Sequence, residues 1–486
     1  MAERFAAMSA DKQKAFLEVL RQQSLDFSRL PIVPARTARE RLSYAQARLW
    51  FLAQLDEQSA AYHVGGALRL TGKLDRAALR GSFEALIARH ESLRTVFRPV
   101  DGGLAEQQIL ADAPFSFVEV DVGSVPNSIE REQAAAHEAR HTHDQAFDLE
   151  RGPLFRVGLI RLDDEDHLLV VVMHHIVSDG WSLKIIVDEF STLYGALSKG
   201  LALPLHVLEP LSLHYADYAA WQRSWLEAGE KDRQLAYWTA QLGEDAPALQ
   251  LPTDHPRGAD TNWRAARHVF ELPPALVEAL GSVSHAQNLT PFMALLAGWQ
   301  ALLHRWTGQG DIRVGVPIAN RQRDEIEGVV GFFVNTQVLR AQVGPQMTLS
   351  QLLAQVREAA LGAQVHQDLP FEQLVEALQP ERSLAHAPLF QVMFNHQRDD
   401  HRALERLPGL TLAPWELPDA AAQFELTLDL HEQPDGRISA VLTYAAELFE
   451  PTTIERLGDH YLAMLQALAE HPEQALGEVE LAGEAE

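Results

Sequence analysis

The sequence contains no cysteine, no long hydrophobic run, and far fewer basic than acidic residues. Without cysteine the chain has no disulfide, no thiolate metal ligand and no cysteine nucleophile, which fits a reducing compartment. No apolar run approaches the ~18 residues that span a bilayer, and residues 1–23 lack the apolar core of a signal peptide. We therefore expect a cytoplasmic protein that is not embedded in a membrane.

The charge of the chain is strongly negative. The net charge of −26 comes from 67 acidic and 41 basic residues. Such an excess of negative charge argues against nucleic acid or an anionic membrane as the main partner, and it favours solubility. With 486 residues, 47% of them hydrophobic, the chain is long enough for two or three domains with ordinary cores.

Several common catalytic patterns are absent as well. The chain has no G-x-x-x-x-G-K-[ST] loop, no G-x-G-x-x-G after a strand, and no G-x-S-x-G nucleophile elbow. The segment "HEARH" at 137–141 matches a zinc-peptidase pattern, in which two histidines on one helix face bind the metal. Charged residues surround this segment and no third ligand stands out. We therefore expect a solvated helix face here and no metal site.

The stretch "VMHHIVSDGWS" at 172–182 is the best candidate for a reactive site. Before it, the segments 154–162 and 167–173 predict a hairpin whose second strand is buried on both faces. A helix is expected to start at Ser182 and to close at Gly200. The two histidines therefore lie where a central strand ends and a loop leads into a helix. Open α/β sheets often place reactive groups at such positions.

Strand geometry predicts different roles for these histidines. Adjacent strand residues point to opposite faces, so one of His174 and His175 can reach a cleft while the other hydrogen-bonds inward. Asp179 lies beyond the turn, close enough to pair with an arginine and hold the loop. Gly180 leaves room for a ligand beside the backbone. These residues favour a catalytic histidine over a purely structural polar strand end.

The stretch resembles the HHxxxDG signature of the condensation domains of nonribosomal peptide synthetases, within the chloramphenicol-acetyltransferase-like superfamily. Six further segments resemble other motifs of this family, in the same order along the chain. They are "SYAQARLWFL" (43–52), "RHESLRTVF" (89–97), "YADYAAW" (215–221), "VGFFVNTQ" (330–337), "HQDLPFE" (366–372) and "RSLAHAPLF" (382–390). The last carries Ala385 where the family usually has serine. The resemblance covers nearly the whole chain.

The resemblance implies an α/β fold with two chloramphenicol-acetyltransferase-like sandwich lobes. They would form a V-shaped pseudodimer with the active site in a tunnel between the lobes. An N-terminal helix and linker are expected at 1–38, the lobe with the histidine pair at 39–210, and the second lobe at 211–486. The second half repeats the helix–strand pattern of the first without a second histidine pair. One site per chain is therefore expected.

The resemblance also assigns roles to residues of the stretch. His175 is implied to be catalytic and His174 structural, with Gly180, Trp181 and Ser182 supporting the motif. The implied reaction is attack of the α-amine of a carrier-bound aminoacyl thioester on an acyl thioester. A neutral imidazole can accept a proton from the amine or orient it by a hydrogen bond. The sequence leaves both roles open.

Further residues are implied by the other motifs. Asp179 is expected to hold the loop through a salt bridge, with Arg94 as the first candidate partner and Arg313 as the second. Asn335 and Tyr215 would line the tunnel and bind substrate. No metal and no covalently bound cofactor are expected. The phosphopantetheine arm would be supplied by carrier proteins, and acyl-CoA would be a co-substrate.

The implied partners are a downstream acceptor carrier protein with its adjoining adenylation domain, and either acyl-CoA or an upstream carrier protein as donor. The chain would be a monomeric domain of a larger synthetase. Because Met1 opens onto a helix and linker that look natural, we favour a starter domain that acylates the first amino acid, often with a fatty acyl group. An elongation domain with a carrier-bound donor is the alternative.

Other members of the superfamily fit less well. Heterocyclisation domains carry aspartates in place of the pair, and epimerisation domains usually lack this Trp-Ser continuation. BAHD acyltransferases need a DFGWG element, which is absent. A hypothesis of a different class is a degenerate domain kept as a docking platform for carrier proteins or tailoring enzymes. Such platforms usually lose the motif histidine or aspartate, but His175 and Asp179 are both present.

Overall fold

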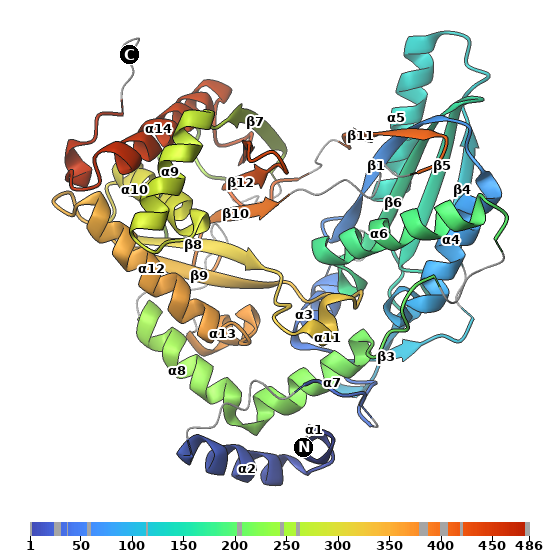
Figure 1. Cartoon of the computed structure of the whole chain (residues 1–486), viewed down its shortest axis with the longest axis horizontal. Coiled ribbons are helices and arrows are strands. Elements are labelled where there is room, and N and C mark those ends of the chain that lie inside the picture. Colours follow the sequence, from blue (N-terminus) through green and yellow to red (C-terminus); the bar gives the residue numbers. More distant parts are fainter. Residues whose placement is uncertain are drawn as a thin grey trace. The chain divides into compact units, whose positions relative to one another are not determined.

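The chain divides into two compact units in the computed structural model (Figure 1). The structure describes residues 2–23, 31–35, 37–55, 60–112, 115–201, 207–243, 247–258, 263–378, 387–398, 407–417 and 421–481. Ala385, the departure from the seventh motif, lies outside these residues. Unit 1 comprises Met1–Asp232, Ala319–Val334 and His401–Pro418, and unit 2 comprises Arg233–Ile318, Asn335–Asp400 and Asp419–Glu486.

The two units are not contiguous in sequence. The predicted lobes are 39–210 and 211–486. The first segment of unit 1 ends at Asp232, which is 22 residues after the predicted boundary at residue 210. The predicted lobes also miss the two later segments that return to unit 1. The predicted N-terminal piece, 1–38, groups with unit 1 as well.

Unit 1 is built on a five-stranded mixed sheet with the strand order β11-β1-β6-β5-β4. Strands β4 and β5 are parallel, and the other neighbours are antiparallel. The hairpin predicted from the sequence is formed by β5 and β6. The strands are β1 (His63–Gly72), β4 (Ser116–Asp121), β5 (Phe155–Asp163), β6 (Asp166–His174) and β11 (Leu410–Trp415).

Helices pack on both faces of this sheet. On one face α4 (Arg76–Arg89) lies beside α6 (Gly180–Leu197), and their core includes Leu169 and Met173 of β6 (Figure 1). On the other face α5 (Ser128–Asp144) packs against β5 and β6, with Val170 and Val172 in the core. Alternate residues of β6 thus enter two different cores, and this confirms the prediction of a strand buried on both sides.

The remaining elements of unit 1 surround this sandwich. Helix α2 packs against η5, where Leu17 meets Trp225 in a small core. These elements are α1 (Ala2–Ala6), α2 (Ala10–Gln22), α3 (Tyr44–Leu55), η2 (Glu91–Arg94), β2 (Thr95–Pro99), η3 (Asp101–Gly103), β3 (Ala105–Ile109), η4 (His175–Val177), α7 (Tyr215–Trp225), η5 (Leu226–Glu230) and α11 (Asp324–Glu327).

The zinc-like segment "HEARH" lies on α5. His137 and His141 are both exposed on this helix. No group of three or more histidine, aspartate or glutamate side chains suited to a metal ion occurs in the described part of the chain. The exposed helix face predicted from the surrounding charges is confirmed.

Unit 2 is built on a six-stranded mixed sheet with the strand order β7-β13-β12-β10-β8-β9. Strand β10 runs parallel to β8 and β12, and the other pairs are antiparallel. The strands are β7 (Ala265–Glu271), β8 (Asp311–Ile318), β9 (Asn335–Gln342), β10 (Val392–Arg398), β12 (Leu426–Glu432) and β13 (Ile438–Ala445). Both units therefore have the predicted α/β class.

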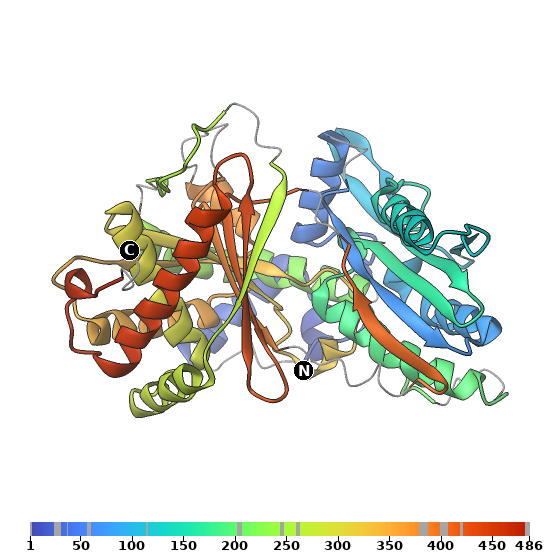
Figure 2. The same ribbon diagram turned by 90° about the horizontal axis from the view of Figure 1, so that it is seen from above.

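Helix α10 is central to the core of unit 2. It packs against both α12 and α14, and Trp299 meets Tyr461 edge-on. Figure 2 shows α14 beside the sheet, and α14 contacts both α9 and β7. The helices are α8 (Lys231–Leu242), α9 (Pro274–Ala286), α10 (Pro291–Thr307), α12 (Leu349–Val365), α13 (Phe371–Leu378), α14 (Pro451–Glu470) and η7 (Leu476–Glu478).

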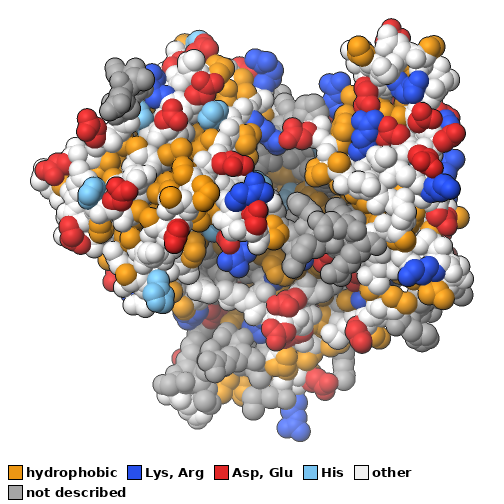
Figure 3. Space-filling model, turned by 45° about the horizontal axis from the view of Figure 1, so that its top comes forward, with side chains coloured by type: hydrophobic (Ala, Val, Ile, Leu, Met, Phe, Trp, Pro, Cys, Tyr) orange, Lys and Arg blue, Asp and Glu red, His pale blue; other side chains and the backbone are white. Residues whose placement is uncertain are grey.

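Acidic side chains are spread over the surface. On the face that Figure 3 shows, they lie among basic and hydrophobic side chains and do not gather into one patch. Among the described helices, none is long and apolar enough to cross a membrane.

Candidate active site

The histidine pair is fixed to both strands that flank β6. His174 ends β6, and its backbone N–H donates to the carbonyl of Leu154 beside β5. His175 begins η4, and its N–H donates to the carbonyl of Tyr62, one residue before β1, at 2.7 Å. The pair therefore lies at the end of the central strand β6, and its backbone is hydrogen-bonded to the segments beside both neighbouring strands.

His174 is buried and neutral. Its side chain is 4% exposed, and its Nδ1 accepts a hydrogen bond from the backbone N–H of Ile176 at 3.1 Å. Nδ1 is thus unprotonated and the ring proton lies on Nε2. Burial, with smaller contributions from His63 and His175, lowers the pKa of His174 to about 3. The ring therefore stays uncharged at any physiological pH while it caps η4.

His175 has the opposite tautomer. Its Nδ1 lies 2.7 Å from the carbonyl oxygen of Ser178, which can only accept, so Nδ1 carries the proton. Nε2 then holds a lone pair, and no group in the described part of the chain hydrogen-bonds to it. Burial lowers the pKa of His175, opposed in part by the Ser178 carbonyl and by Asp179. At neutral pH this imidazole can accept a proton at Nε2.

Asp179 connects the histidine turn to the rest of unit 1. It is fully buried, and its Oδ1 accepts from the backbone N–H of Ser182 at 2.8 Å. Its Oδ2 accepts from the backbone N–H of Phe333 at 2.9 Å. Because Asp179 is the N-cap, helix α6 begins at Gly180, two residues before the predicted start at Ser182.

The arginine that pairs with Asp179 is Arg321, and the predicted candidates Arg94 and Arg313 are both wrong. Nη2 of Arg321 lies 3.1 Å from Oδ1 of Asp179, and both side chains are almost completely buried. Arg94 instead donates to the carbonyl of Leu110. Arg313 belongs to unit 2, where it forms an ion pair with Asp311.

The residues after Arg321 form a loop, 329–334, that is anchored beside His175. The Oγ of Ser182 donates to the carbonyl of Gly331 and accepts from its N–H, at 2.9 and 3.0 Å. The hydroxyl of Tyr215 donates to the carbonyl of Phe332 at 2.5 Å and also bonds the Oγ of Ser43. Three consecutive loop residues are thus held, since Phe333 binds Asp179.

Two residues that were predicted to bind substrate form hydrogen bonds within the protein. Tyr215 is 2% exposed and its hydroxyl bonds Ser43 and Phe332, so its predicted place in a tunnel wall stays a prediction. The amide of Asn335 donates to the carbonyls of Gln367 and Leu369, and its oxygen accepts from the N–H of Phe371. In this structure Asn335 therefore fastens the "HQDLPFE" segment to β9.

The other two motif residues lie at the surface of α6. Trp181 is 41% exposed, and its Nε1–H donates to the carbonyl of Glu327 at 3.0 Å. A Cβ added at Gly180 would meet nothing within 4 Å. The room for a ligand beside Gly180 is thus present, and its use by a ligand stays a prediction.

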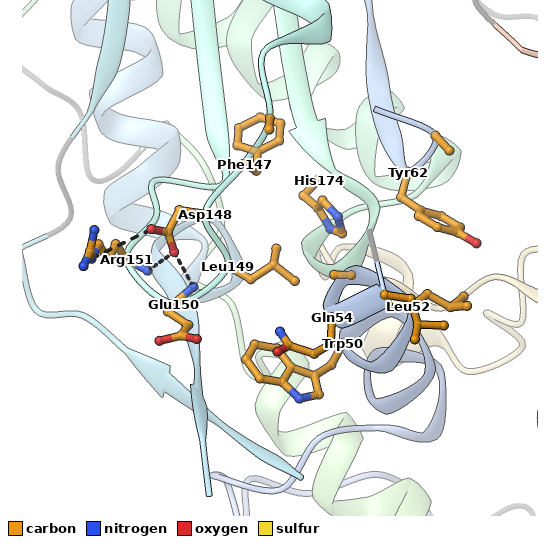
Figure 4. Close-up of a pocket in the computed structure, with 14 residues that line it drawn as sticks. Trp50, Leu52, Gln54, Tyr62, Phe147, Asp148, Leu149, Glu150, Arg151 and His174 are labelled. Atoms are coloured by element: carbon orange, nitrogen blue, oxygen red, sulfur yellow. Dashed lines mark hydrogen bonds and ion pairs between the residues drawn. The ribbon is translucent and has the colours of Figure 1, made fainter. Parts of the chain in front are cut away.

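A pocket of about 670 Å³ opens next to His174 rather than His175. In Figure 4, the His174 ring points into a space bordered by Leu149 and by the aromatic side chains of Trp50, Tyr62 and Phe147. The sequence motifs did not predict this pocket, because its walls come from α3 and from the loop before β5.

The packing of Gly331 against Tyr215 gives a stability prediction. A Cβ at position 331 would lie 2.0 Å from Cδ2 of the Tyr215 ring, which is itself buried and hydrogen-bonded. We expect Gly331→Ala to lower the free energy of unfolding by about 1–3 kcal/mol, measured by urea denaturation. Gly180→Ala is the matched control, since nothing meets its Cβ. Equal loss of stability in both variants would contradict this packing.

Comparisons with known proteins agree with the geometry. The sequence model of the family "Condensation domain" matches residues 39–486. The chain is 44% identical over 441 residues to malpinin synthetase of Mortierella alpina, a match that covers 90% of this chain and 6% of that protein. It is 38% identical to phosphinothricin tripeptide synthetase PhsC of Streptomyces viridochromogenes, covering 96% of this chain and 43% of that protein. The chain thus spans less than half of either relative.

Solved structures show the same fold. The X-domain from teicoplanin biosynthesis superposes with a TM-score of 0.81 at 29% identity, covering 93% of this chain and all of that one. The condensation domain from the monacolin K polyketide synthase MokA gives a TM-score of 0.76 at 24% identity, covering 90% and 98% of the two chains. With the family match over 39–486 and relatives above 30% identity, the chain belongs to the condensation domain family of nonribosomal peptide synthetases, which form peptide bonds.

Proposed function

We propose that His175 is the catalytic residue of this condensation domain, acting on the α-amine of a carrier-bound aminoacyl thioester. The observation that carries the proposal is the state of its imidazole. The Ser178 carbonyl holds the proton on Nδ1, and burial keeps the ring neutral, so the Nε2 lone pair is ready to accept a proton or a hydrogen bond.

The proposed reaction needs no oxidant and no metal. The neutral amine nitrogen attacks the thioester carbonyl, a C–N bond forms, the C–S bond breaks, and the thiolate leaves. One amine proton is lost in the process, and Nε2 of His175 takes it up and returns it to the thiolate sulfur. An α-amine has an ordinary pKa of ~7.7–8.0, so a base or an orienting acceptor at this position favours the reactive form.

The acyl donor is the finer part of the proposal. The two relatives are larger synthetases, of which this chain matches 6% in malpinin synthetase and 43% in PhsC. This likeness favours a carrier-bound peptidyl or aminoacyl donor, as in elongation. The starter function with acyl-CoA is the second candidate for the donor. In either case we propose that the acceptor arrives on the phosphopantetheine arm of a carrier protein loaded by an adenylation domain.

A side-by-side comparison of acyl donors tests this proposal. The protein is incubated with an aminoacyl-carrier acceptor and, in parallel, with acyl-CoAs of several chain lengths or with an aminoacyl-carrier donor. Mass spectrometry of the acceptor arm then identifies the product. We expect a dipeptidyl arm with the carrier donor. An N-acylated arm formed only from acyl-CoA would establish the starter function and overturn the elongation proposal.

A docking platform is a candidate function from a different class. It is favoured by one comparison, because a second structure of the X-domain from teicoplanin biosynthesis, 27% identical over the match, is a complex with OxyB. The complete arrangement around His175 and Asp179 favours catalysis instead. Wild-type protein that binds carrier proteins yet forms no product with any donor would support the platform.

A further inference from the structure

Phe332 packs its ring on the imidazole of His175. The ring centroids lie 4.5 Å apart with an interplanar angle of 53°. Phe332 is partly buried, and its ring packs against two hydrophobic clusters of unit 1 as well as against His175. It covers one side of the histidine and occupies space that water would otherwise take.

The loop that carries Phe332 is held at three successive residues. Gly331 is bonded through both its N–H and its carbonyl, Phe332 through its carbonyl, and Phe333 through its N–H. Their partners are Ser182, Tyr215 and Asp179, which are all buried. These anchors on a short irregular segment fix the position of the Phe332 side chain, which faces His175.

Few charges act on this histidine. Asp179 raises its pKa, but Asp179 is paired with the buried Arg321. His174 is neutral because its pKa is about 3, and burial raises the pKa of Tyr215 well above its ordinary value, so this phenol is neutral too. The main influence on His175 is therefore how much water reaches its ring, and Phe332 limits that access.

We infer that Phe332 is a positioning residue for the proposed reaction: it fixes the plane of the His175 ring and keeps water from one of its faces. This inference rests on the proposed function of His175. No bond to substrate is required of Phe332. Without the Phe332 ring, the imidazole of His175 could tilt and water could reach it. Nε2 would then no longer be directed at the α-amine of the acceptor.

Phe332→Ala and Phe332→Leu test the inference by two measurements. The first is the pH titration of His175 in the free protein, followed by NMR with labelled histidine and assigned by comparison with His175→Gln. The second is the pH dependence of kcat and KM for amide formation. Phe51→Ala on α3 is the matched control, since this phenylalanine is 60% exposed.

In Phe332→Ala, we expect the titration midpoint of His175 to rise toward the ordinary ~6.5. Because the imidazole must be neutral to act, the acid limb of the rate should move to higher pH, and the loss should be larger at pH 6 than at pH 8. We expect kcat to fall by about 10- to 100-fold, with the acceptor KM within about twofold. Phe332→Leu, which keeps an apolar cover, should lose rate with a smaller shift of the midpoint.

Unchanged midpoint and rate in a folded Phe332→Ala protein would overturn the inference. If circular dichroism shows that this variant is unfolded, Phe332→Leu decides, and wild-type rate and midpoint in that variant would likewise overturn it. If wild-type protein forms no product with any donor, the proposed function fails, and the NMR titration alone still decides whether Phe332 controls the hydration of His175.

Discussion

Replacing His175 with alanine is expected to reduce amide formation by about 100- to 10,000-fold, the range found when a positioned general base is removed. In the wild-type protein, Nε2 is the one imidazole nitrogen of this residue without a partner in the described part of the chain. Alanine removes this lone pair and leaves the amine of the acceptor to lose its proton to water. The residual rate would come from holding the two thioesters close together.

The measurement is product formation on the acceptor carrier, followed by mass spectrometry in single-turnover experiments. His137→Ala is a matched control, because it removes an exposed histidine from α5 in the same unit. Both variants should bind the carrier protein as the wild type does. Wild-type turnover by His175→Ala would show that the chemistry lies elsewhere.

The pH profile of the wild-type reaction adds a second readout. Because burial lowers the pKa of His175, the ring becomes protonated only below the ordinary value of ~6.5. The acid limb of the rate should therefore lie below that pH. His174, with a pKa of about 3, cannot account for a limb in this range.

The local features of this site were predictable from the sequence. The apolar run 167–173 indicated a central strand, and the hairpin with 154–162 follows from the polar turn between the two segments. A short-range pattern of this kind reports on which residues are buried and how often they alternate. Different environments for His174 and His175 were also expected, but from two adjacent strand residues, whereas in the structure His174 ends β6 and His175 begins η4.

The long-range features were not predictable in this way. Arg321 lies 142 residues after Asp179, on a segment that leaves unit 2 and joins unit 1. Nothing in the neighbourhood of Arg321 marks it as the partner, since other arginines, such as Arg94 and Arg313, also lie near recognisable motifs or strands. Strand β11 likewise pairs with β1 from the far end of the chain. Such pairings depend on chain topology, and one sequence does not reveal it.

The buried pair of Asp179 and Arg321 also has energetic consequences. Desolvation lowers the pKa of Arg321, and Asp179 opposes this effect. Arg321 gives further hydrogen bonds to the carbonyls of Ile326 and Val329, so its charge is compensated from several sides. Asp179 holds Ser182 and Phe333 at the same time. Loss of one member would leave the other as a buried charge without its ionic partner.

Asp179→Asn is therefore expected to lower the free energy of unfolding by about 3–5 kcal/mol, measured by urea denaturation. Asp188→Asn on the same helix is the matched control. Its partner Lys184 is an exposed i,i+4 neighbour, so the loss should stay below about 0.5 kcal/mol. In the double variant with Arg321→Met the buried charge disappears, and the loss should be smaller than the sum of the two single losses by about 1–3 kcal/mol. Strict additivity would mean that the two side chains do not stabilise one another, and that the histidine turn is held by the backbone contacts of the 329–334 loop alone.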